Sequence, residues 1–345
     1  MKATVIYEHG GRDVLRYVDD LPIPEPGLGE VRLRMGAAAL NRLDLFVREG
    51  WKGLNLHMPH VTCSDGAGIV DAVGTGVAGL HVGDRVAVDP TIIPPACLES
   101  GDDPRFCDGV GIMGEHYPGF GAEYVLVPAR NCVVMPDHVG YAEAAAAGLV
   151  YVTAWHSLIT RGGLRAGESV LIVGAGGGVN TASLQIAKLA GCRVIVIGSS
   201  AERCAQAADL GADEVIDRSQ TPNWSRAVYE LTNKRGVDVV VDNVGQATLF
   251  DSIRALRRGG RILIVGNTSG PKFELDIRYL FSKQISLIGS TMGPHEDYVQ
   301  AMRLVFAGKL KPIVGVRLPL DQVAEGHRLL EAGEVFGKVV IEIGS

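Results

Sequence analysis

The feature that most constrains the fold is an alternation of apolar strands and amphipathic helices between about Gly167 and Ser290. The apolar runs SVLIVG, CRVIVIGSS, VDVVVDNVG and RILIVGNTSG are separated by segments with helical spacing, such as TASLQIAKLAG and AERCAQAADLGA. Strands that are apolar throughout are typical of a parallel sheet buried on both faces, and right-handed crossovers then give a doubly wound, Rossmann-type sheet. We therefore predict an α/β protein whose dinucleotide-binding domain covers residues 141–290.

The first 140 residues follow a different pattern. Short β-rich runs such as EVRLRMGAAAL, AGIVDAVGTGV and AEYVLVPA are cut by glycine and proline, which indicates a mostly antiparallel β domain. The alanine-rich helical pattern that begins at Tyr141 marks the change of domain. The tail after residue 290 is too short to fold alone, so we expect residues 291–345 to complete the first domain.

The strand SVLIVG leads directly into a glycine-rich turn and then a helix. The turn contains Gly174, Gly176, Gly177 and Gly178 and is followed by Val179. Glycines at this junction let the backbone approach a pyrophosphate, and the helix N-terminus offers free N–H groups and the positive end of its dipole. The strand–turn–helix context favours a dinucleotide site over a simple tight turn.

The end of the next strand favours NADPH over NADH. NAD sites commonly carry Asp or Glu there to bind the ribose hydroxyls, whereas this strand ends in Ser199 and Ser200 and is followed by Arg203 and Arg218. Hydroxyl and guanidinium groups suit a 2′-phosphate. Taken alone, Arg203 is equally consistent with a solvated helix residue.

Later strands contribute further candidates for cofactor binding, because the carboxyl ends of parallel strands line the cofactor crevice. The candidates at these ends are Asn243, Val244, Val265, Gly266 and Thr268. Thr153, in the helical segment TAWHSL, is expected to approach the nicotinamide.

Charge and cysteine content exclude several classes of protein. The net charge is −6 without a long run of either sign, so neither nucleic acid nor an anionic membrane is indicated as a partner. The N-terminal sequence lacks the pattern of a signal peptide, and no apolar run is long enough to span a bilayer. The six cysteines are scattered, as expected for reduced thiols. We expect a cytoplasmic protein.

With these features in view, the whole chain resembles the medium-chain dehydrogenase/reductase superfamily. The likeness is closest to its zinc-independent NADPH:quinone oxidoreductase and enoyl reductase branch. The stretch AAALNRLDLFVREG is similar to that branch's Asn-x-x-Asp…Arg-x-Gly signature, carried here by Asn41, Asp44, Arg48 and Gly50. MPHVTCSDGAGIVDAVG and the ending GKVV also fit. The resemblance implies that the first domain is GroES-like.

The resemblance also implies where zinc alcohol dehydrogenases of the superfamily hold their catalytic metal. Those positions are Asn41, Ser64 and Leu149 in this sequence. Their side chains do not form a stable zinc site, which prefers thiolate, imidazole or carboxylate ligands, so we expect no catalytic zinc.

The resemblance places a structural-zinc lobe, with four cysteines, in another part of the first domain. In that region only Cys97 and Cys107 remain, so a structural zinc is not expected, and a disulfide between the two is an alternative. Further side chains without a convincing ligand spacing are those of Asp102, Asp103, His116 and Cys132.

Hydride addition to a conjugated acceptor suits such a site better than alcohol oxidation, because an enone or quinone spreads the incoming charge onto its own oxygen. We expect NADPH in the cleft between the domains. Asn41 would donate its amide to the substrate oxygen or the nicotinamide ribose, Asp44 would position its neighbours, and Arg48 would hold the loop or Asp44. A purely structural ion pair is the alternative for Asp44 and Arg48.

The substrate is expected to be a quinone or an α,β-unsaturated carbonyl compound. Phe46, Trp51 and Tyr151 are candidates for its apolar walls, with core packing as the alternative for Tyr151. His295 is either a proton donor or a surface histidine.

Two other functions stay open. The first is an alcohol or aldehyde dehydrogenase of the zinc type with an unusual metal site. The second is a non-catalytic NADPH-binding protein. For assembly, the apolar strand QISLIGS predicts edge-to-edge pairing between subunits in a homodimer or homotetramer.

Overall fold

The computed structural model describes residues 1–100 and 107–344. The chain divides into two compact units. Unit 1 comprises Met1–Leu149 and Pro294–Ser345, and unit 2 comprises Val150–Gly293. The boundary at 149/150 falls inside helix α3 (Tyr141–Trp155), whereas the sequence placed the change of domain at the start of this helix.

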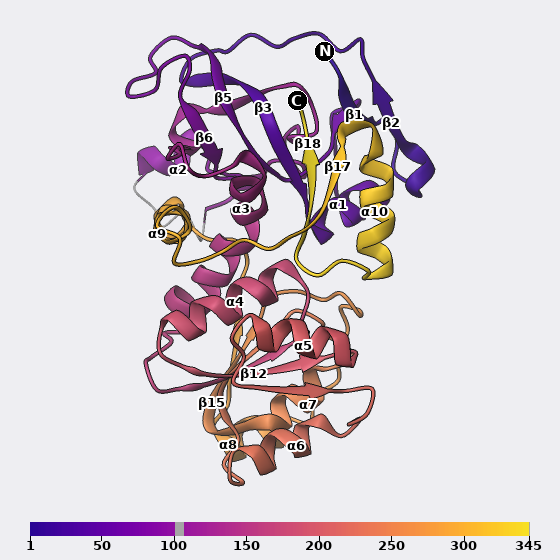
Figure 1. The fold of residues 1–345 in the computed structure, drawn as a ribbon, viewed down its shortest axis with the longest axis vertical. Helices are drawn as coiled ribbons and strands as arrows, with labels where there is room; N and C mark the ends of the chain where they lie inside the picture. The colour runs from indigo at the N-terminus through magenta and orange to yellow at the C-terminus, as the bar shows by residue number, and fades with distance from the viewer. Residues whose placement is uncertain (101–106, 345) are drawn as a thin grey trace. The chain divides into compact units, whose positions relative to one another are not determined.

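Unit 2 is built on a parallel sheet in the order β13-β12-β11-β14-β15-β16. Helices α4 and α5 cover one face of the sheet, and α6, α7 and α8 cover the other (Figure 1). The chain reverses direction across the sheet between β11 and β14, which makes this the switch point of a doubly wound fold. The elements are β11 (Ser169–Val173), α4 (Gly178–Leu189), β12 (Arg193–Gly198), α5 (Ala201–Asp209), β13 (Glu214–Asp217), α6 (Trp224–Leu231), β14 (Val237–Asp242), α7 (Leu249–Ala255), β15 (Leu256–Ile264), α8 (Arg278–Lys283) and β16 (Ser286–Gly289).

The inner strands of unit 2 are apolar because helices cover both of their faces. Every residue of β11 and β14 is buried. Leu171 and Val240 belong to a core that also includes Trp224 from α6 and Ile253 from α7. Burying such side chains supplies the main driving force for folding, at roughly 25 cal/mol for each Å² of apolar surface.

Unit 1 is built around the long strand β3 (Glu30–Leu40), which pairs antiparallel with β5, β9 and β18. The sheet runs β10-β6-β5-β3-β18-β17, and a second sheet runs β2-β1-β4. The remaining elements are β1 (Ala3–Ile6), β2 (Leu15–Val18), α1 (Arg42–Glu49), β4 (His60–Val61), β5 (Asp65–Val73), β6 (Arg85–Val88), β7 (Thr91–Ile92), α2 (Pro95–Ser100), β8 (Gly111–Ile112), β9 (Tyr124–Pro128), β10 (Cys132–Val134), α9 (His295–Phe306), β17 (Val314–Pro319), α10 (Val323–Ala332) and β18 (Lys338–Glu342).

Buried and more exposed side chains alternate along the first part of β3, and the buried ones contribute to the core of unit 1. Val31, Leu33 and Met35 point into a core shared with Ile341 of β18, while the intervening residues are more exposed. The C-terminal strand therefore belongs to the first domain, and the parallel Rossmann-type sheet is a separate unit. The predicted fold class, a Rossmann-type sheet with a GroES-like, mostly antiparallel domain, is confirmed.

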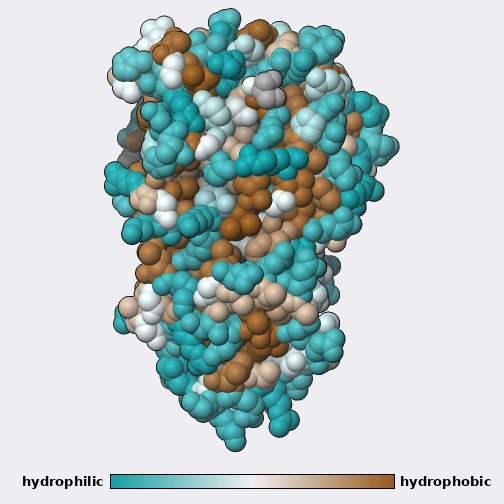
Figure 2. Space-filling view, viewed as in Figure 1, coloured by the Kyte–Doolittle hydropathy of each residue, from teal (hydrophilic) through white to brown (hydrophobic). Residues whose placement is uncertain are grey.

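Hydrophilic side chains dominate the face of the molecule seen in Figure 2, with apolar residues gathered in patches. Among the described residues, no helix combines the length and apolar character that crossing a membrane requires.

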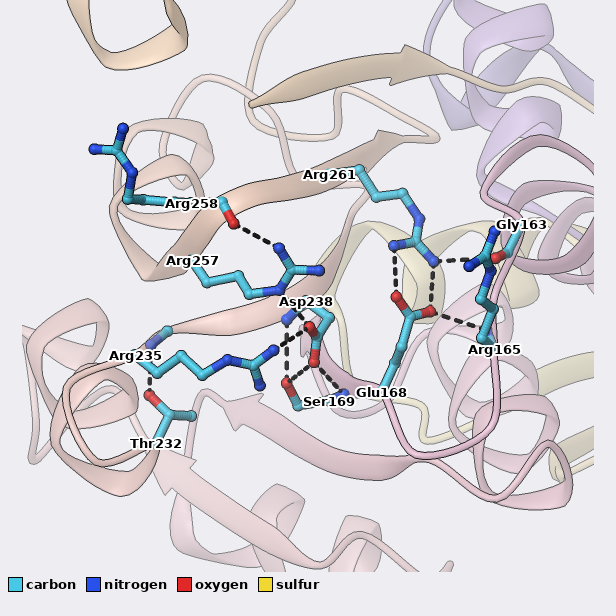
Figure 3. A network of polar contacts seen from close by, with 11 residues as sticks. Gly163, Arg165, Glu168, Ser169, Thr232, Arg235, Asp238, Arg257, Arg258 and Arg261 are labelled. Atoms are coloured by element: carbon cyan, nitrogen blue, oxygen red, sulfur yellow. Dashed lines mark hydrogen bonds and ion pairs between the residues drawn. The ribbon is translucent and has the colours of Figure 1, made fainter. Parts of the chain in front are cut away.

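A group of charged side chains fastens the amino ends of the strands in unit 2. Figure 3 shows Arg235 and Arg257 converging on Asp238 of β14. The buried Asp238 carboxylate also accepts the Ser169 backbone N–H at 2.8 Å and the Ser169 hydroxyl at 2.7 Å. Burial alone would raise the pKa of Asp238, but the hydrogen bonds from Arg257 and Ser169 outweigh it and lower the pKa to about 2.

Asp238→Asn should reduce the free energy of unfolding at pH 7 by about 2–4 kcal/mol, because Arg235 and Arg257 lose a buried counter-charge. The folded-state pKa lies below the ordinary 3.8, so this stabilisation is present above about pH 4 and lost as the pH falls through about 2. Urea unfolding of both proteins at several pH values measures it. Asp276→Asn, at an exposed pair with Arg278, is the control and should change little. If the difference in unfolding free energy between the wild type and Asp238→Asn stayed the same at low pH, the lowered pKa of Asp238 would be contradicted.

Candidate active site

The first candidate residues lie where β3 runs into α1. Asn41 is the N-cap residue of the helix, and the Asp44 carboxylate at the third helical position accepts the Asn41 backbone N–H at 2.6 Å. Asn and Asp favour such positions because their side chains satisfy N–H groups that the first helical turn leaves without partners. The helix ends before Gly50, whose φ of +76° suits glycine.

The Asn41 side chain is buried and uses all of its hydrogen-bonding groups within unit 1. Its Nδ2 donates to Ser64 Oγ at 3.0 Å and to Asp65 Oδ2 at 2.8 Å. Its Oδ1 accepts a hydrogen bond from the ammonium of Lys338. A substrate oxygen could receive an Asn41 amide hydrogen only by displacing Ser64 or Asp65. That Asn41 donates directly to the substrate stays a prediction. Its contacts favour a role in positioning neighbouring side chains.

Strand pairing explains why these residues meet. In the sheet of unit 1, Ala39 of β3 lies opposite Asp65 of β5, and Leu40 lies opposite Val339 of β18. The neighbouring residue Lys338 thereby reaches Asp65, with 3.0 Å between Nζ and Oδ2.

Asp65 is fully buried and has partners on both oxygens. Its Oδ1 accepts the backbone N–H of Leu149 at 2.6 Å, and its Oδ2 faces Lys338. Burial raises the pKa of Asp65, while the charge of Lys338 and the hydrogen bond from Asn41 oppose this effect. The approach to α3 requires Gly148, since a Cβ there would collide with the carboxylate.

Asp44 has fewer hydrogen-bond partners than the neighbouring carboxylate of Asp65. Its Oδ2 accepts the Ser64 hydroxyl at 3.0 Å, whereas its buried Oδ1 has no hydrogen-bond partner among the described residues. Burial raises the pKa of Asp44 to about 7, although hydrogen bonds from Asn41 and Ser64 and the charge of Lys338 act in the opposite direction. This carboxyl group therefore changes its protonation state near neutral pH.

Arg48 contacts other groups than Asp44. Its guanidinium donates to Glu331 at 2.6 Å, to Glu49 at 2.9 Å and to the Gly10 carbonyl at 3.2 Å. Nη1 also lies 3.4 Å from Nδ1 of the buried His327. Burial and the charge of Arg48 lower the pKa of His327 to about 3, so this ring is neutral. Arg48 thus fastens α1 to α10, and its catalytic role stays a prediction.

The candidate substrate walls differ in exposure. Phe46 and Trp51 are 40% and 43% exposed, which leaves both available to a ligand. Tyr151 is only 1% exposed, and its hydroxyl receives a hydrogen bond from Gln185 at 3.0 Å. The contacts of Tyr151 favour core packing, which was the alternative for this residue. His295 lies 2.9 Å from the buried carboxylate of Asp89, so it is not an isolated surface histidine.

The glycine-rich turn of unit 2 connects β11 to α4 with a geometry that requires glycine. Gly174 has a φ of +105°, and a Cβ on Gly177 would lie 2.7 Å from Asn180 Oδ1. Asn180 stands where the common fingerprint has a small residue. Its Nδ2 donates to the Val173 carbonyl at 2.9 Å, and its Oδ1 accepts from Asn243 at 2.8 Å. Asn180 therefore ties the turn to the end of β14, a function that the sequence did not reveal.

The backbone of Arg203 and Arg218 is tied to the segment that ends β12. Ser200 caps α5 by accepting the Arg203 backbone N–H at 3.3 Å, and the backbone of Arg218 bonds to the Gly198 carbonyl. The structure adds a carboxylate that sequence reasoning missed, because β13 places Asp217 opposite Gly198. The signal was available in the sequence EVID, but only the strand register shows that it lies beside this tip.

The ends of β14 and β15 are organised by one buried carboxylate. Asp242 Oδ1 accepts the backbone N–H groups of Val244 at 2.9 Å and Gly245 at 3.0 Å. Its Oδ2 accepts the hydroxyls of Thr248 and Ser252. The backbone of the other candidates packs against this loop. The Thr268 N–H donates to the backbone carbonyl of Asn243, and the Val265 N–H donates to the backbone carbonyl of Asp242. A Cβ on Gly266 would lie 3.0 Å from the Asn243 carbonyl.

These strand ends fit a dinucleotide. Adjacent parallel strands β12, β11, β14 and β15 present their carboxyl ends along one edge of the unit 2 sheet. The turn at Gly174–Gly177 leads into α4, whose N-cap Gly177 leaves the backbone N–H groups of the first turn without a side-chain cap among the described residues. Thr153 is buried, and its hydroxyl contacts Met292 Sδ at 3.7 Å.

The residues of unit 1 do not fit a catalytic zinc. At the three positions implied by the resemblance, Asn41 and Ser64 are hydrogen-bonded to each other, and Leu149 offers only its backbone N–H to Asp65. An ammonium, that of Lys338, bonds into the same group. Among the described residues, no set of three or more His, Cys, Asp or Glu side chains is arranged to hold a metal ion.

The two cysteines of the lobe that follows β7 form a disulfide. Cys97 of α2 is bonded to Cys107, with 6.1 Å between the Cα atoms. The disulfide is thus the alternative that the structure supports for this pair. His116 accepts the Ile112 backbone N–H at 3.3 Å, and Cys132 is a free thiol. The other two candidates, Asp102 and Asp103, lie outside the described residues.

Two family models match the chain. Residues 178–307 match a zinc-binding dehydrogenase, and residues 27–137 match an alcohol dehydrogenase GroES-like domain. Together these matches describe a dehydrogenase-type protein with a GroES-like part.

Individual relatives agree with this class over nearly their full length. Acryloyl-coenzyme A reductase of Metallosphaera sedula is 31% identical, and the alignment covers 99% of each chain. Quinone oxidoreductase of Homo sapiens is 28% identical, with 99% of this chain and 97% of the relative covered. A solved structure of an NAD-dependent alcohol dehydrogenase is 44% identical, and its superposition has a TM-score of 0.94 and covers 100% of both chains. The chain belongs to the medium-chain dehydrogenase/reductase superfamily, as the resemblance predicted.

Proposed function

We propose that this oxidoreductase transfers hydride from NADPH to a conjugated acceptor, a quinone or an α,β-unsaturated carbonyl compound, without a catalytic zinc ion. The observation that carries the proposal is the hydrogen bonding at two of the implied zinc-ligand positions: the Asn41 amide donates to Ser64 and Asp65 and accepts from Lys338, so neither Asn41 nor Ser64 presents a metal ligand. The similarity to a quinone oxidoreductase and to an acryloyl-coenzyme A reductase supports the same class of acceptor.

The chemistry of the acceptor explains the preference. Oxidation of a simple alcohol needs a strong Lewis acid to stabilise the alkoxide. A conjugated acceptor instead spreads the charge of the incoming hydride onto its own oxygen, where hydrogen-bond donors suffice. NADPH supplies the hydride when bound, and the residues of unit 1 would orient donors and hold protons around the acceptor.

A specific observation also favours a second candidate, an NAD-dependent alcohol dehydrogenase. The solved NAD-dependent alcohol dehydrogenase is 44% identical to this chain, which exceeds the identity of the quinone oxidoreductase and of the acryloyl-coenzyme A reductase. Against this candidate stands the chemistry of Asn41 and Ser64, which are poor ligands for zinc.

The first experiment follows NADPH and NADH oxidation with quinones, enones, enals, enoyl thioesters and simple aldehydes, in excess chelator. We expect turnover with conjugated acceptors and at least tenfold lower kcat/KM with saturated aldehydes, because only the former delocalise the added charge. Activity confined to saturated aldehydes or alcohols, and dependent on added zinc, would establish the dehydrogenase instead. Cofactor binding without turnover of any acceptor would indicate a non-catalytic protein.

The preference for NADPH is proposed to depend on the tip of β12. Arg203→Ala should weaken NADPH binding by about tenfold and leave NADH binding unchanged, since the guanidinium would pair with the 2′-phosphate. Arg218→Ala should have the same direction of effect. Asp217→Asn should strengthen NADPH binding, because it removes a negative charge from the same tip. Fluorescence titration with both cofactors measures these constants, with the exposed Arg303→Ala as control. Equal losses for NADH and NADPH would contradict the proposal.

We also propose that the protein is a homodimer or homotetramer assembled through β16. This strand ends the sheet of unit 2, and edge strands offer N–H and C=O groups for pairing with another chain. In β16 Leu287 is 39% exposed, and at the preceding helix α8 Ile277 and Phe281 are 67% and 68% exposed. A second copy would bury these side chains around a twofold axis.

Sedimentation at micromolar concentration should therefore give at least a dimer. Phe281→Asp should weaken association by placing a charge in the apolar contact, and Leu28→Asp, an exposed site in unit 1, should not. A strictly monomeric wild type would contradict the proposed assembly.

A further inference from the structure

Two asparagine side chains connect the two halves of the unit 2 sheet at its switch point. Strands β11, β12 and β13 lie on one side of that point, and β14, β15 and β16 lie on the other. Asn180, in the first turn of α4, donates its Nδ2 to the Val173 carbonyl at the end of β11, at 2.9 Å. Its Oδ1 accepts a hydrogen bond at 2.8 Å from Nδ2 of Asn243, which directly follows β14. The pair thus spans the place where a doubly wound sheet binds a dinucleotide.

We propose that Asn180 is a positioning residue for the nicotinamide half of the cofactor. Through its hydrogen bond it fixes the amide of Asn243, and Asn243 contacts that half. The inference rests on the dinucleotide cofactor proposed above. It gives a role in binding to a position at which the common fingerprint has a small residue for helix packing.

The hydrogen bonds of Asn180 determine which way both amides face. The Val173 carbonyl can only accept, so the NH2 group of Asn180 must face it. The oxygen of the Asn180 amide can also only accept, so Asn243 must present its own NH2 group there. Oδ1 of the half-buried Asn243 has no hydrogen-bond partner in the part of the chain that the structure describes. One amide oxygen of fixed orientation is thereby left for a hydroxyl or carboxamide N–H group of a ligand.

The surroundings of the two amides leave them little freedom. Asn180 is 4% exposed, so its amide is enclosed by the protein. A Cβ on Gly174 would lie 3.1 Å from Asn180 Nδ2, and one on Gly177 would lie 2.7 Å from its Oδ1, so the glycine-rich turn lies directly against the amide. On the other side, the backbone carbonyl of Asn243 accepts the Thr268 N–H at 3.3 Å. The pair therefore connects the turn with the loops that follow β14 and β15.

A small residue in place of Asn180 would affect the two halves of the cofactor site differently. The glycine-rich turn could still bind a pyrophosphate, because its N–H groups belong to the backbone. Asn243 would lose the partner that fixes its amide, and it lies in the half of the sheet beyond the switch point. Binding of the whole dinucleotide should therefore weaken more than binding of its adenosine half.

Calorimetric titration with NADPH and with adenosine 2′,5′-bisphosphate tests this difference, because the second ligand lacks the nicotinamide half. Asn180→Ala should weaken NADPH binding about tenfold and leave the dissociation constant of adenosine 2′,5′-bisphosphate within about threefold, as expected for the loss of about one hydrogen bond to the missing half. Glu230→Ala, at an exposed side chain of α6, is the control and should change neither constant.

A double-mutant cycle shows whether Asn180 acts through Asn243. Asn243→Ala should give the same difference between the two ligands, and the variant with both substitutions should bind NADPH within about threefold of either single variant. Because Asn243 is half-buried, its variant keeps the test available if Asn180→Ala does not fold. Equal losses for the two ligands, or additive losses in the double variant, would overturn the inference.

Failure of the proposed function gives a different result. A wild type that binds NADPH but reduces no conjugated acceptor would contradict the proposed reaction, and the titrations would still decide the role of Asn180. A wild type that binds neither NADPH nor adenosine 2′,5′-bisphosphate would overturn both.

Discussion

The contact between Lys338 and Asp65 is the interaction around which unit 1 is organised. It forms because β3 pairs with β5 along one edge and with β18 along the other, so that two buried charges from distant parts of the chain meet. Asn41 and the N–H of Leu149 complete the partners of Asp65, and through Asn41 the start of α1 is placed. Strand pairing, helix capping and charge compensation therefore depend on the same few atoms.

Unit 2 also contains buried carboxylates with hydrogen-bond partners. Buried carboxylates lie at both ends of β14, Asp238 at the amino end and Asp242 at the carboxyl end. The first is saturated by arginines and a serine, and it stabilises the sheet. The second arranges backbone N–H groups in the loop that follows, next to the turn secured by Asn180. The edge available to a cofactor is thus kept in shape by the hydrogen bonds of Asp242 and Asn180.

The elements that could be predicted from sequence were those with a local signal. Apolar runs such as VDVVVD and the turn at Gly174 have periodicity and composition that a parallel sheet and a phosphate loop require. The partners of Asn41 could not be predicted in the same way. Lys338 lies 297 residues further along the chain, and only the pairing of β18 with β3 shows that its side chain reaches Asn41. The same applies to Asp217, whose place beside Gly198 depends on strand order. Arg48 illustrates a signature residue two of whose observed partners, Glu331 and Gly10, come from outside the signature.

The position of Lys338 in the chain has a consequence for synthesis. Asp65 is made 273 residues before its counter-ion, and all of unit 2 is made between the two. Domains generally fold as units while the chain is being made. The ribosome therefore produces a complete nucleotide-binding unit while the carboxylate of the other unit still has to remain hydrated or protonated. The charge balance of unit 1 is completed only when its last strand is added.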